Sequence, residues 1–307
     1  MFSRPCLLIS IFVFAPQPSA GAEDVLEPGS KPVKVVEGCK FTEGPVFNSA
    51  GDLLFSDGAN DRIMRLARGG ELSVFKQRCG RVNGMTLDHQ GRLVVCQSAG
   101  DGGGRRVARY EIDGTEIVLA DRFEARPFIG PNDVCLDGKG RIFFTDPYYG
   151  PPAEKSQPTS GVYRIDADGR VTRVVSDLLR PNGIVVTADS RQVYISDRGT
   201  QKLHRFKLDG DGSLHPDGIV YDFSPNRGVD GMRLDVEGNI YAAAGEKETT
   251  GLFVVSPNGR LLLHQPLPEF ATNVAFGGSD RRDLFITATT GVYKLRTTRA
   301  GAAVPVK

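Results

Sequence analysis

The sequence predicts an all-β protein, a six-bladed β-propeller, because one pattern of short apolar runs recurs six times after residue 40. Each copy begins with a polar lead residue and continues through a small turn into further β-branched or aromatic runs. The lead residues are separated by 40, 49, 50, 48 and 43 positions, and such periods indicate a repeat architecture. About four runs per copy and six copies give six four-stranded blades.

The first run of each copy is predicted to be the innermost strand of a blade. These first runs are 43–47, 83–87, 132–136, 182–186, 230–234 and 273–276. The second runs are 51–57, 91–97, 140–146, 192–197, 238–244 and 283–289. Third runs follow, and a fourth is visible in several copies, as at 72–76, 117–120 and 171–175. Gly, Asp and Asn bound these runs, as is usual for strands and hairpins, and the sequence shows no convincing amphipathic helix.

The sixth copy ends after its third run, 291–295, so its outer strand must come from elsewhere in the chain. The apolar stretch 31–38 precedes the first inner strand and could supply it, which would join the two chain ends and cover a sheet edge. A sandwich or a solenoid is the alternative, but the even, long period argues against both. We therefore expect one propeller domain over residues 31–297 and a disordered tail over 298–307.

The first 22 residues are predicted to be a secretory signal peptide. Arg4 supplies a positive charge before the apolar stretch 6–15, and small residues follow at 19–22. Ten apolar residues are too few to span a bilayer as a helix. We therefore expect export to a periplasmic or extracellular location, with an uncleaved anchor as the alternative.

The composition limits the classes of partner. The chain has 307 residues, 40% of them hydrophobic, and a formal net charge of +1. That charge gives no support to a nucleic-acid partner, or to a membrane partner after removal of the signal. We expect a small-molecule partner and a protein that is a monomer or a dimer. The four cysteines of the mature chain lack metal-binding spacing. Cys39 and Cys79 lie at equivalent positions of neighbouring copies, where a disulfide and two buried thiols are both open.

The six lead residues point to a metal site. Inner strands of a propeller line a central channel, so their first residues would meet at one mouth. These residues are Glu43, Asn83, Asn132, Asn182, Asp230 and Asn273. Carboxylate and amide oxygens are hard ligands, which suit Ca²⁺ or Mg²⁺ and tolerate Mn²⁺ or Zn²⁺. Any one of the six could instead be a turn residue, because Asn-Gly and Asp-Gly are common turn pairs. Because all six copies have a polar residue at the same position, and both acids fall there, we favour the interpretation as a metal site.

Other catalytic arrangements have less support. Serine-type catalysis needs a positioned histidine, and all four histidines lie outside the lead positions. Asp146 and Asp197 end second runs and could approach the mouth, but hydrogen bonding at a strand end is the simpler interpretation.

Six motifs, taken together and in their order along the chain, resemble those of a known family. They are EGPVF at 43–47, RVNGMTLDHQGRLVVC at 81–96, PNDVCLDGKGRIFFTDPYYG at 131–150, RPNGIVV at 180–186, DGMRLDVEGNIYAA at 230–243 and TNVAFGG at 272–278. Together they resemble the gluconolactonase family, which includes regucalcin (senescence marker protein). The resemblance implies a six-bladed propeller with one catalytic divalent cation at the channel mouth. Ca²⁺ is the first expectation, with Zn²⁺, Mg²⁺ or Mn²⁺ as alternatives.

The resemblance also assigns roles by motif. Glu43, Asn182 and Asp230 would be metal ligands, and Asp230 would also be the general base. Asn132 would contact the metal or the substrate. We place Asn83 and Tyr148 with Asn132 among the substrate-binding residues, and packing of a loop is the alternative for Tyr148 and Tyr149.

The implied activity is metal-dependent hydrolysis of a sugar-acid lactone. Some relatives carry a substrate-binding arginine two residues before the equivalent of Asn132, where this chain has Gly130. This departure leaves the identity of the lactone open. A non-catalytic propeller that binds a sugar or peptide is the main alternative, and another metal-dependent esterase is the second.

Overall fold

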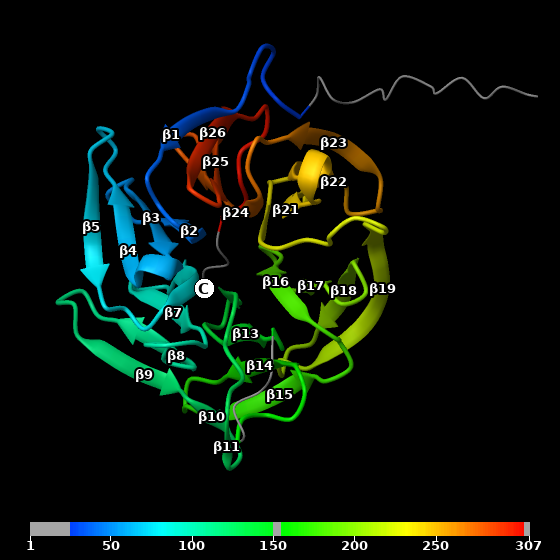
Figure 1. The fold of residues 1–307 in the computed structure, drawn as a ribbon. Coiled ribbons are helices and arrows are strands. Elements are labelled where there is room, and N and C mark those ends of the chain that lie inside the picture. The colour runs from blue at the N-terminus through cyan, green and yellow to red at the C-terminus, as the bar shows by residue number, and fades with distance from the viewer. Residues whose placement is uncertain (1–24, 150–154, 304–307) are drawn as a thin grey trace, which may run out of the picture.

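The computed structural model, which describes residues 25–149 and 155–303, confirms the six-bladed β-propeller (Figure 1). Six antiparallel four-stranded sheets surround a central axis, and in five of them the strands follow one another in sequence order. Within the described residues no helix is long and apolar enough to cross a membrane. The predicted signal peptide, 1–22, lies outside the described residues.

The strands are short and follow the predicted runs. Blades 1 and 2 comprise β2 (Thr42–Phe47), β3 (Leu53–Asp57), β4 (Arg62–Leu66) and β5 (Leu72–Gln77), then β6 (Val82–Leu87), β7 (Leu93–Gln97), β8 (Arg106–Tyr110) and β9 (Glu116–Ala120). A small hairpin of β10 (Arg122–Phe123) and β11 (Arg126–Pro127) follows. Blade 3 comprises β12 (Val134–Leu136), β13 (Ile142–Asp146), β14 (Gly161–Ile165) and β15 (Val171–Val175).

The second half of the ring repeats this order. Blade 4 comprises β16 (Pro181–Val186), β17 (Gln192–Asp197), β18 (Lys202–Leu208) and β19 (Leu214–Asp222). Blade 5 comprises β20 (Met232–Leu234), β21 (Ile240–Ala244), β22 (Gly251–Val255) and β23 (Leu261–Pro266). Blade 6 contains β24 (Ala271–Gly277), β25 (Asp283–Ala288) and β26 (Gly291–Arg296). Two 3₁₀ turns, Gly58–Asn60 and Lys247–Thr249, complete the regular elements of the described chain.

The N-terminal strand closes the ring, as predicted. Strand β1 (Val33–Val36) pairs antiparallel with β26, with Val33 opposite Lys294 and Val36 opposite Val292. Figure 1 shows this blue strand lying beside the red C-terminal strands. The outer strand of blade 6 therefore comes from the opposite end of the chain, which leaves no blade with only three strands.

Glu269 stabilises the closure of the ring through hydrogen bonds and an ion pair. Its carboxylate accepts hydrogen bonds from the backbone N–H of Thr290 (2.7 Å) and the hydroxyl of Tyr293 (2.7 Å), and it pairs with Lys34 of β1. Burial raises the pKa of Glu269, but the bonds from Lys34, Thr290 and Tyr293 outweigh it and lower the pKa from 4.5 to about 2. The ionised carboxylate is therefore favoured in the folded ring.

We expect Glu269→Gln to lower the free energy of unfolding at pH 7 by roughly 1–3 kcal/mol, because it weakens hydrogen bonds to a charged acceptor. The wild type should lose this contribution as the pH falls from about 4.5 towards 2, since the depressed pKa stabilises the fold only while the group is ionised. Urea unfolding at pH 7 and pH 3 measures both effects. The control is Glu248→Gln, at an exposed position. Equal stability of the two variants at pH 7 would contradict the prediction.

Apolar packing between neighbouring sheets holds the blades together. Second strands such as β3 and β21 are buried along their whole length, because each lies between two other blades. In blade 3 the rings of Phe128, Phe144 and Tyr163 pack with centroids 5.0–5.4 Å apart. Burial of such surface is worth about 25 cal/mol per Å² and dominates the stability of the ring.

The glycines that follow the lead residues permit close approach of neighbouring inner strands. A Cβ at Gly84 would lie 2.6 Å from the backbone oxygen of Asn132, and one at Gly183 would lie 2.2 Å from that of Asp230. The interpretation of these Asn-Gly pairs as turns is wrong, since Gly84 and Gly183 lie within β6 and β16. The pairs mark where adjacent inner strands meet at the axis.

We expect Gly183→Ala to destabilise the propeller by roughly 1–3 kcal/mol, because the added methyl group would push β16 away from the backbone at Asp230. Gly69→Ala is a matched control, since a Cβ at Gly69 meets no atom within 4 Å. Chemical denaturation of both variants measures the difference. If Gly183→Ala were as stable as Gly69→Ala, the inner strands would not be held at this distance.

The chain remains bonded to the propeller beyond the predicted domain limits. Val25 and Leu26 are buried in a core cluster of blades 5 and 6. After β26, the backbone N–H of Thr298 donates to Val25 and that of Ala302 donates to Leu234. The tail predicted as disordered, 298–307, therefore carries backbone hydrogen bonds as far as Ala302, and residues 304–307 lie outside the described residues.

All four described cysteines are buried free thiols. Of the two alternatives for Cys39 and Cys79, the structure has two buried thiols and not a disulfide. Burial is the largest cause that raises the pKa of each of these thiols to about 11.

Candidate functional site

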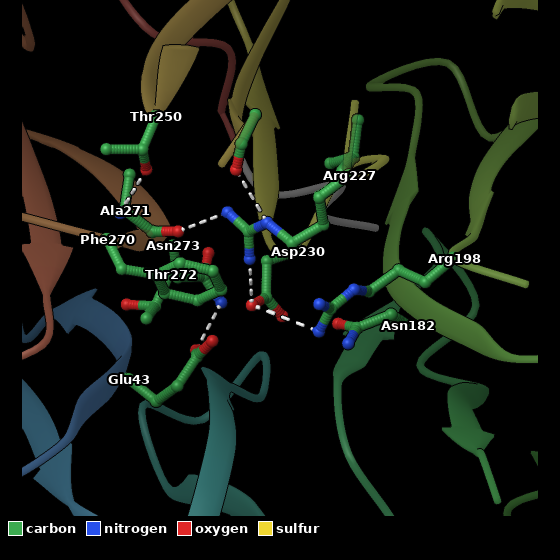
Figure 2. Close-up of polar contacts among 12 residues, drawn as sticks. Glu43, Asn182, Arg198, Arg227, Asp230, Thr250, Phe270, Ala271, Thr272 and Asn273 are labelled. Carbon is green, nitrogen blue, oxygen red and sulfur yellow. Dashed lines mark hydrogen bonds and ion pairs between the residues drawn. The ribbon is translucent and has the colours of Figure 1, made fainter. Parts of the chain in front are cut away.

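The six lead residues lie at the starts of the six inner strands, at one mouth of the channel. Five of them are buried, with 1–8% of each residue exposed, and Asn83 is half-buried. Figure 2 shows Glu43, Asn182, Asp230 and Asn273 directed towards one shared space. Four of the six lead residues therefore lie around one space, as the repeat phase predicts.

Second strands fix the backbone that carries the lead residues. Asp146 accepts hydrogen bonds from the backbone N–H groups of residues 129 and 130, at 2.9 and 2.7 Å. Asp197 accepts the equivalent bonds from residues 179 and 180, at 3.2 and 2.8 Å. These carboxylates hold the residues just before Asn132 and Asn182, which confirms the strand-end interpretation of Asp146 and Asp197.

Glu43 is a buried carboxylate with no ion-pair partner among the described residues. Its Oε2 atom accepts hydrogen bonds from the backbone N–H of Gly44 (2.7 Å) and from Nδ2 of Asn273 (2.9 Å). Burial and the charges of Asp230 and Asp133 raise the pKa of Glu43 to about 8. The side chain therefore lies where negative charge accumulates, and a cation there would stabilise it.

Asp230 is held by two arginines (Figure 2). Nη1 of Arg227 donates to Oδ2 of Asp230 at 2.7 Å, and Nη1 of Arg198 lies 3.5 Å from the same oxygen. Both contacts use Oδ2. The hydrogen bond from Arg227 therefore fixes the rotation of the carboxylate and leaves Oδ1 as the oxygen for other chemistry.

Arg227 is itself fixed on every side. Nε donates to the backbone oxygen of Gly245 (2.9 Å), Nη2 donates to that of Ala271 (2.7 Å), and the guanidinium lies 3.6 Å from the centre of the Phe270 ring. Burial lowers the pKa of Arg227 to about 10 although Asp230 raises it, so the residue stays charged at neutral pH. Arg227 is thus a rigid support for Asp230.

Arg198 is less constrained than Arg227. It contacts Asp230 only at 3.5 Å, and its side chain is 21% exposed. Nη1 donates to the hydroxyl of Tyr149 at 3.4 Å, and the guanidinium lies 5.7 Å from the centre of the Tyr149 ring. Arg198 is therefore a partly open cation at the site.

Asn182 has its amide orientation set by Tyr149. Its Nδ2 atom donates to the hydroxyl of Tyr149, which directs the amide oxygen away from that ring. The adjacent Tyr148, predicted to bind substrate, makes its recorded hydrogen bond through the backbone, to Oγ of Ser160. Of these two tyrosines, Tyr149 is the one that forms a hydrogen bond with a lead residue, and the substrate role of Tyr148 stays a prediction.

The remaining lead residues differ in whether their side chains form hydrogen bonds. Asn273 supports Glu43 through the bond described above and accepts the backbone N–H of Val274 on its own side-chain oxygen. Asn132 accepts the backbone N–H of Gly84 on its main-chain oxygen, which joins blades 2 and 3. No side-chain hydrogen bond is recorded for Asn132 or Asn83 among the described residues, so both side chains remain available to a ligand.

Asp133 adds a third carboxylate next to the ring. Its Oδ2 atom accepts the backbone N–H of Ile184 at 3.2 Å, and its Oδ1 atom is buried with no hydrogen-bond partner in the described part of the chain. Burial is the main cause that raises its pKa. A buried acceptor without a donor is costly unless a cation or water satisfies it.

These residues fit a divalent cation. Glu43 lies within electrostatic range of Asp230 and Asp133, and in the described part of the chain the ion pairs of these three carboxylates are those of Asp230 with Arg227 and Arg198. Glu43 and the amide oxygens of Asn182 and Asn132 are hard donors without a competing cation. No group of three or more His, Cys, Asp or Glu side chains with metal-binding geometry occurs in residues 25–149 and 155–303. A cation here would therefore depend on amide oxygens as well as on carboxylates.

Sequence reasoning missed three residues of the site, namely Asp133, Arg198 and Arg227. Arg198 and Arg227 lie in loops outside β17 and β20, where the six-fold repeat provides no position to compare. Asp133 could have been found from the sequence, because it follows a lead residue at the position where four other copies of the repeat have glycine.

Position 130, where the chain has glycine, is tightly packed against Ala99. A Cβ at Gly130 would lie 3.0 Å from Cβ of Ala99 and 3.1 Å from its nitrogen. The backbone N–H of Gly130 is already bonded to Asp146.

Histidine takes no part in this arrangement. His204 and His264 lie on β18 and β23, the third and fourth strands of their blades. His264 stacks on Phe253 at a ring-centroid distance of 4.1 Å. These positions agree with the expectation that serine-type catalysis is not used.

Comparisons with known proteins agree with the fold and the motifs. A gluconolactonase of Zymomonas mobilis is 28% identical to this chain, over 89% of the chain and 83% of that protein. The solved structure of a gluconolactonase from Xanthomonas campestris has 28% identity and a TM-score of 0.81, covering 90% of this chain and 92% of its own. The structure of a calcium-binding protein, regucalcin, from Agrobacterium tumefaciens has 18% identity and a TM-score of 0.72, covering 88% and 94%, and shows the shared fold alone.

A family model described as the SMP-30/Gluconolactonase/LRE-like region matches residues 41–290. This range runs from the residue before β2 to the turn before β26 and includes every lead residue. The match covers most of the chain and all six inner strands. The chain therefore belongs to the SMP-30/gluconolactonase/LRE-like family.

Proposed function

We propose that the protein is a divalent-metal-dependent hydrolase that opens a sugar-acid lactone at the mouth lined by the lead residues. The observation that carries the proposal is Glu43, a buried carboxylate placed beside Asp230 and Asp133 without a cationic partner of its own among the described residues. The names of the similar proteins, gluconolactonase and lactonase, support the substrate class. We also propose that the protein acts after export, as its first 22 residues predict.

The cation would be held by Glu43, Asp230 and Asn182, with Asn132 as a further ligand or a substrate contact. Ca²⁺ is the first candidate, with Mg²⁺, Mn²⁺ and Zn²⁺ as alternatives. When bound, such an ion would polarise the lactone carbonyl and stabilise the negative charge that develops on its oxygen.

Asp230 would act as the general base. It would accept a proton from the water that attacks the carbonyl carbon, while the ring C–O bond breaks and the released oxygen takes up a proton. Arg227 holds the carboxylate through Oδ2 at 2.7 Å, so Oδ1 is the oxygen directed to the water. The product is an open hydroxy acid, whose new carboxylate would attract Arg198.

We expect Arg198→Gln to raise KM about tenfold or more with a smaller change in kcat, because the variant loses a charge-assisted contact to the substrate. Inhibition by added gluconate should weaken in parallel. The control is Arg191→Gln, whose side chain is 84% exposed on the same blade. Unchanged KM and gluconate inhibition, in a variant that binds metal normally, would remove Arg198 from the substrate site.

The test of the proposed function is acid release from glucono-1,5-lactone by the mature protein. The protein is first chelated, and Ca²⁺, Mg²⁺, Mn²⁺ or Zn²⁺ is then restored, with spontaneous hydrolysis subtracted. Turnover that returns with metal supports the proposal and identifies the usable ions. Metal binding without turnover on this or related lactones would indicate another ester as substrate. Neither binding nor turnover would favour a propeller that only binds a sugar or peptide.

A further inference from the structure

A cavity of about 500 Å³ is lined by the halves of the inner strands that lie away from the lead residues. All six blades contribute to it through the far halves of their inner strands. Its wall includes Val46, Thr86, Leu136, Val186, Leu234 and Phe276. Each of these residues lies three or four positions beyond a lead residue, which is about 10–14 Å along a strand.

This cavity is separate from the proposed catalytic site. None of the six lead residues lines it, and Asp133, Arg198 and Arg227 do not line it either. Its volume falls within the usual range for sites of small organic ligands, about 300–1,000 Å³. The cavity is therefore large enough for a ligand of its own.

The wall of the cavity combines apolar side chains with charged side chains that are all positive. Valine, leucine, phenylalanine and alanine make up half of the residues that line it. The charged residues that line it are Arg68, Arg233 and Arg281, and no Asp, Glu or Lys of the described chain joins them. Arg233 interacts with the carboxylate of Asp133, which leaves Arg68 and Arg281 as the guanidinium groups open to a ligand. An apolar wall favours a hydrocarbon group, and open guanidinium groups favour a carboxylate or a similar anion.

The arginines are available because nearby acids have other partners. Asp52 pairs with Arg65 at 2.7 Å, and Asp283 pairs with Arg296 at 3.0 Å. Arg68 and Arg281 are exposed residues of turns, and neither forms a side-chain ion pair within the described residues. Their charges can therefore meet a ligand without breaking an existing pair.

We propose that this cavity binds an amphipathic organic anion, specifically a medium-chain alkyl carboxylate. The carboxylate would lie at the rim beside Arg68 and Arg281, and the alkyl chain would extend towards Val186 and Phe276. A sugar-acid lactone does not fit this description, because it is rich in hydroxyl groups and carries no charge. The ligand of this cavity therefore differs in class from the proposed substrate.

Octanoate is the probe, measured with the full mature chain by titration calorimetry. We expect one octanoate per chain, and binding of 1-octanol about tenfold weaker or more, because the alcohol keeps the chain length and loses the charge. The double variant Arg68→Gln/Arg281→Gln should weaken octanoate binding by a similar factor. The control, Arg170→Gln/Arg191→Gln, removes the same charge from side chains that are 69% and 84% exposed elsewhere.

An optical readout is available because the chain contains no tryptophan. Phe276→Trp places a single reporter in the wall of the cavity, and its emission should change as octanoate binds. Phe75→Trp is the control, since Phe75 is 48% exposed on the outer strand β5 and should not respond.

The proposal fails if octanoate does not bind, if 1-octanol binds equally well, or if the Arg68→Gln/Arg281→Gln variant binds as tightly as its control. Ala302 and Ala303 also line the cavity, so a chain that ends at Ala303 is tested in parallel. Binding only to that shortened chain would show that residues 304–307 compete for the cavity, and would overturn the proposal for the full chain. Because every readout is binding, the result does not depend on lactone hydrolysis.

Discussion

Replacement of Asp230 by asparagine is expected to lower kcat for lactone hydrolysis by about 10²–10⁴-fold, because the amide cannot accept the proton of the attacking water. Asparagine has nearly the same size as aspartate, and its side-chain oxygen can still accept the hydrogen bond that Arg227 donates at 2.7 Å. The substitution therefore removes the base and one negative charge while it keeps the shape of the site.

The measurement must separate loss of chemistry from loss of structure. Arg227 is 8% exposed, and without the charge of Asp230 its guanidinium would be buried without a full counter-ion, which costs stability. Circular dichroism, urea unfolding and metal titration of Asp230→Asn are therefore compared with those of Asp189→Asn, a carboxylate whose side chain is 59% exposed on blade 4. Turnover near the wild-type rate in folded, metal-loaded Asp230→Asn would exclude Asp230 as the base.

The fold was predictable because it is a repeat. Six inner strands in phase, hairpin turns between runs and a missing outer strand in the last copy all follow from the positions of apolar runs. Closure by β1 also followed, since an unpaired edge on blade 6 needed a partner and only 31–38 preceded the first blade. The ends were misjudged because Val25, Leu26 and Ala302 lie in segments outside the repeat, where tertiary contacts and not the pattern decide what is ordered.

The site was predictable only where it follows the repeat. The placement of Glu43, Asn182 and Asp230 around one space was predictable because the starts of inner strands must converge on the axis. Arg198 and Arg227 reach the same place from loops, and a loop position carries no periodic signal. Choosing between Tyr148 and Tyr149 depends on how the backbone runs after β13, which the sequence does not determine.

Glu43→Gln is expected to lower the affinity for the divalent cation by about 10–100-fold or more, because a charged ligand becomes neutral. The amide oxygen of glutamine can still accept the hydrogen bond from Asn273, so the side chain should remain in place. The metal-free variant should be at least as stable as the metal-free wild type at pH 7. Burial, Asp230 and Asp133 raise the pKa of Glu43 to about 8, so folding must keep this carboxyl protonated at a pH where the unfolded chain would ionise it, and the substitution removes that cost. Affinity and stability are thus expected to change in opposite directions, which a general loss of structure would not produce.

Titration calorimetry with Ca²⁺, Mg²⁺, Mn²⁺ and Zn²⁺ on chelated protein measures the affinity, and urea unfolding of the metal-free protein measures the stability. Glu37→Gln is the control, since Glu37 is exposed six residues earlier and removes the same charge from the same end of the chain. Unchanged affinity for all four ions in Glu43→Gln would show that Glu43 is not a ligand. The carboxylate would then have to be stabilised by protonation, by Asn273 and by the backbone of Gly44, and metal dependence would lose its main support.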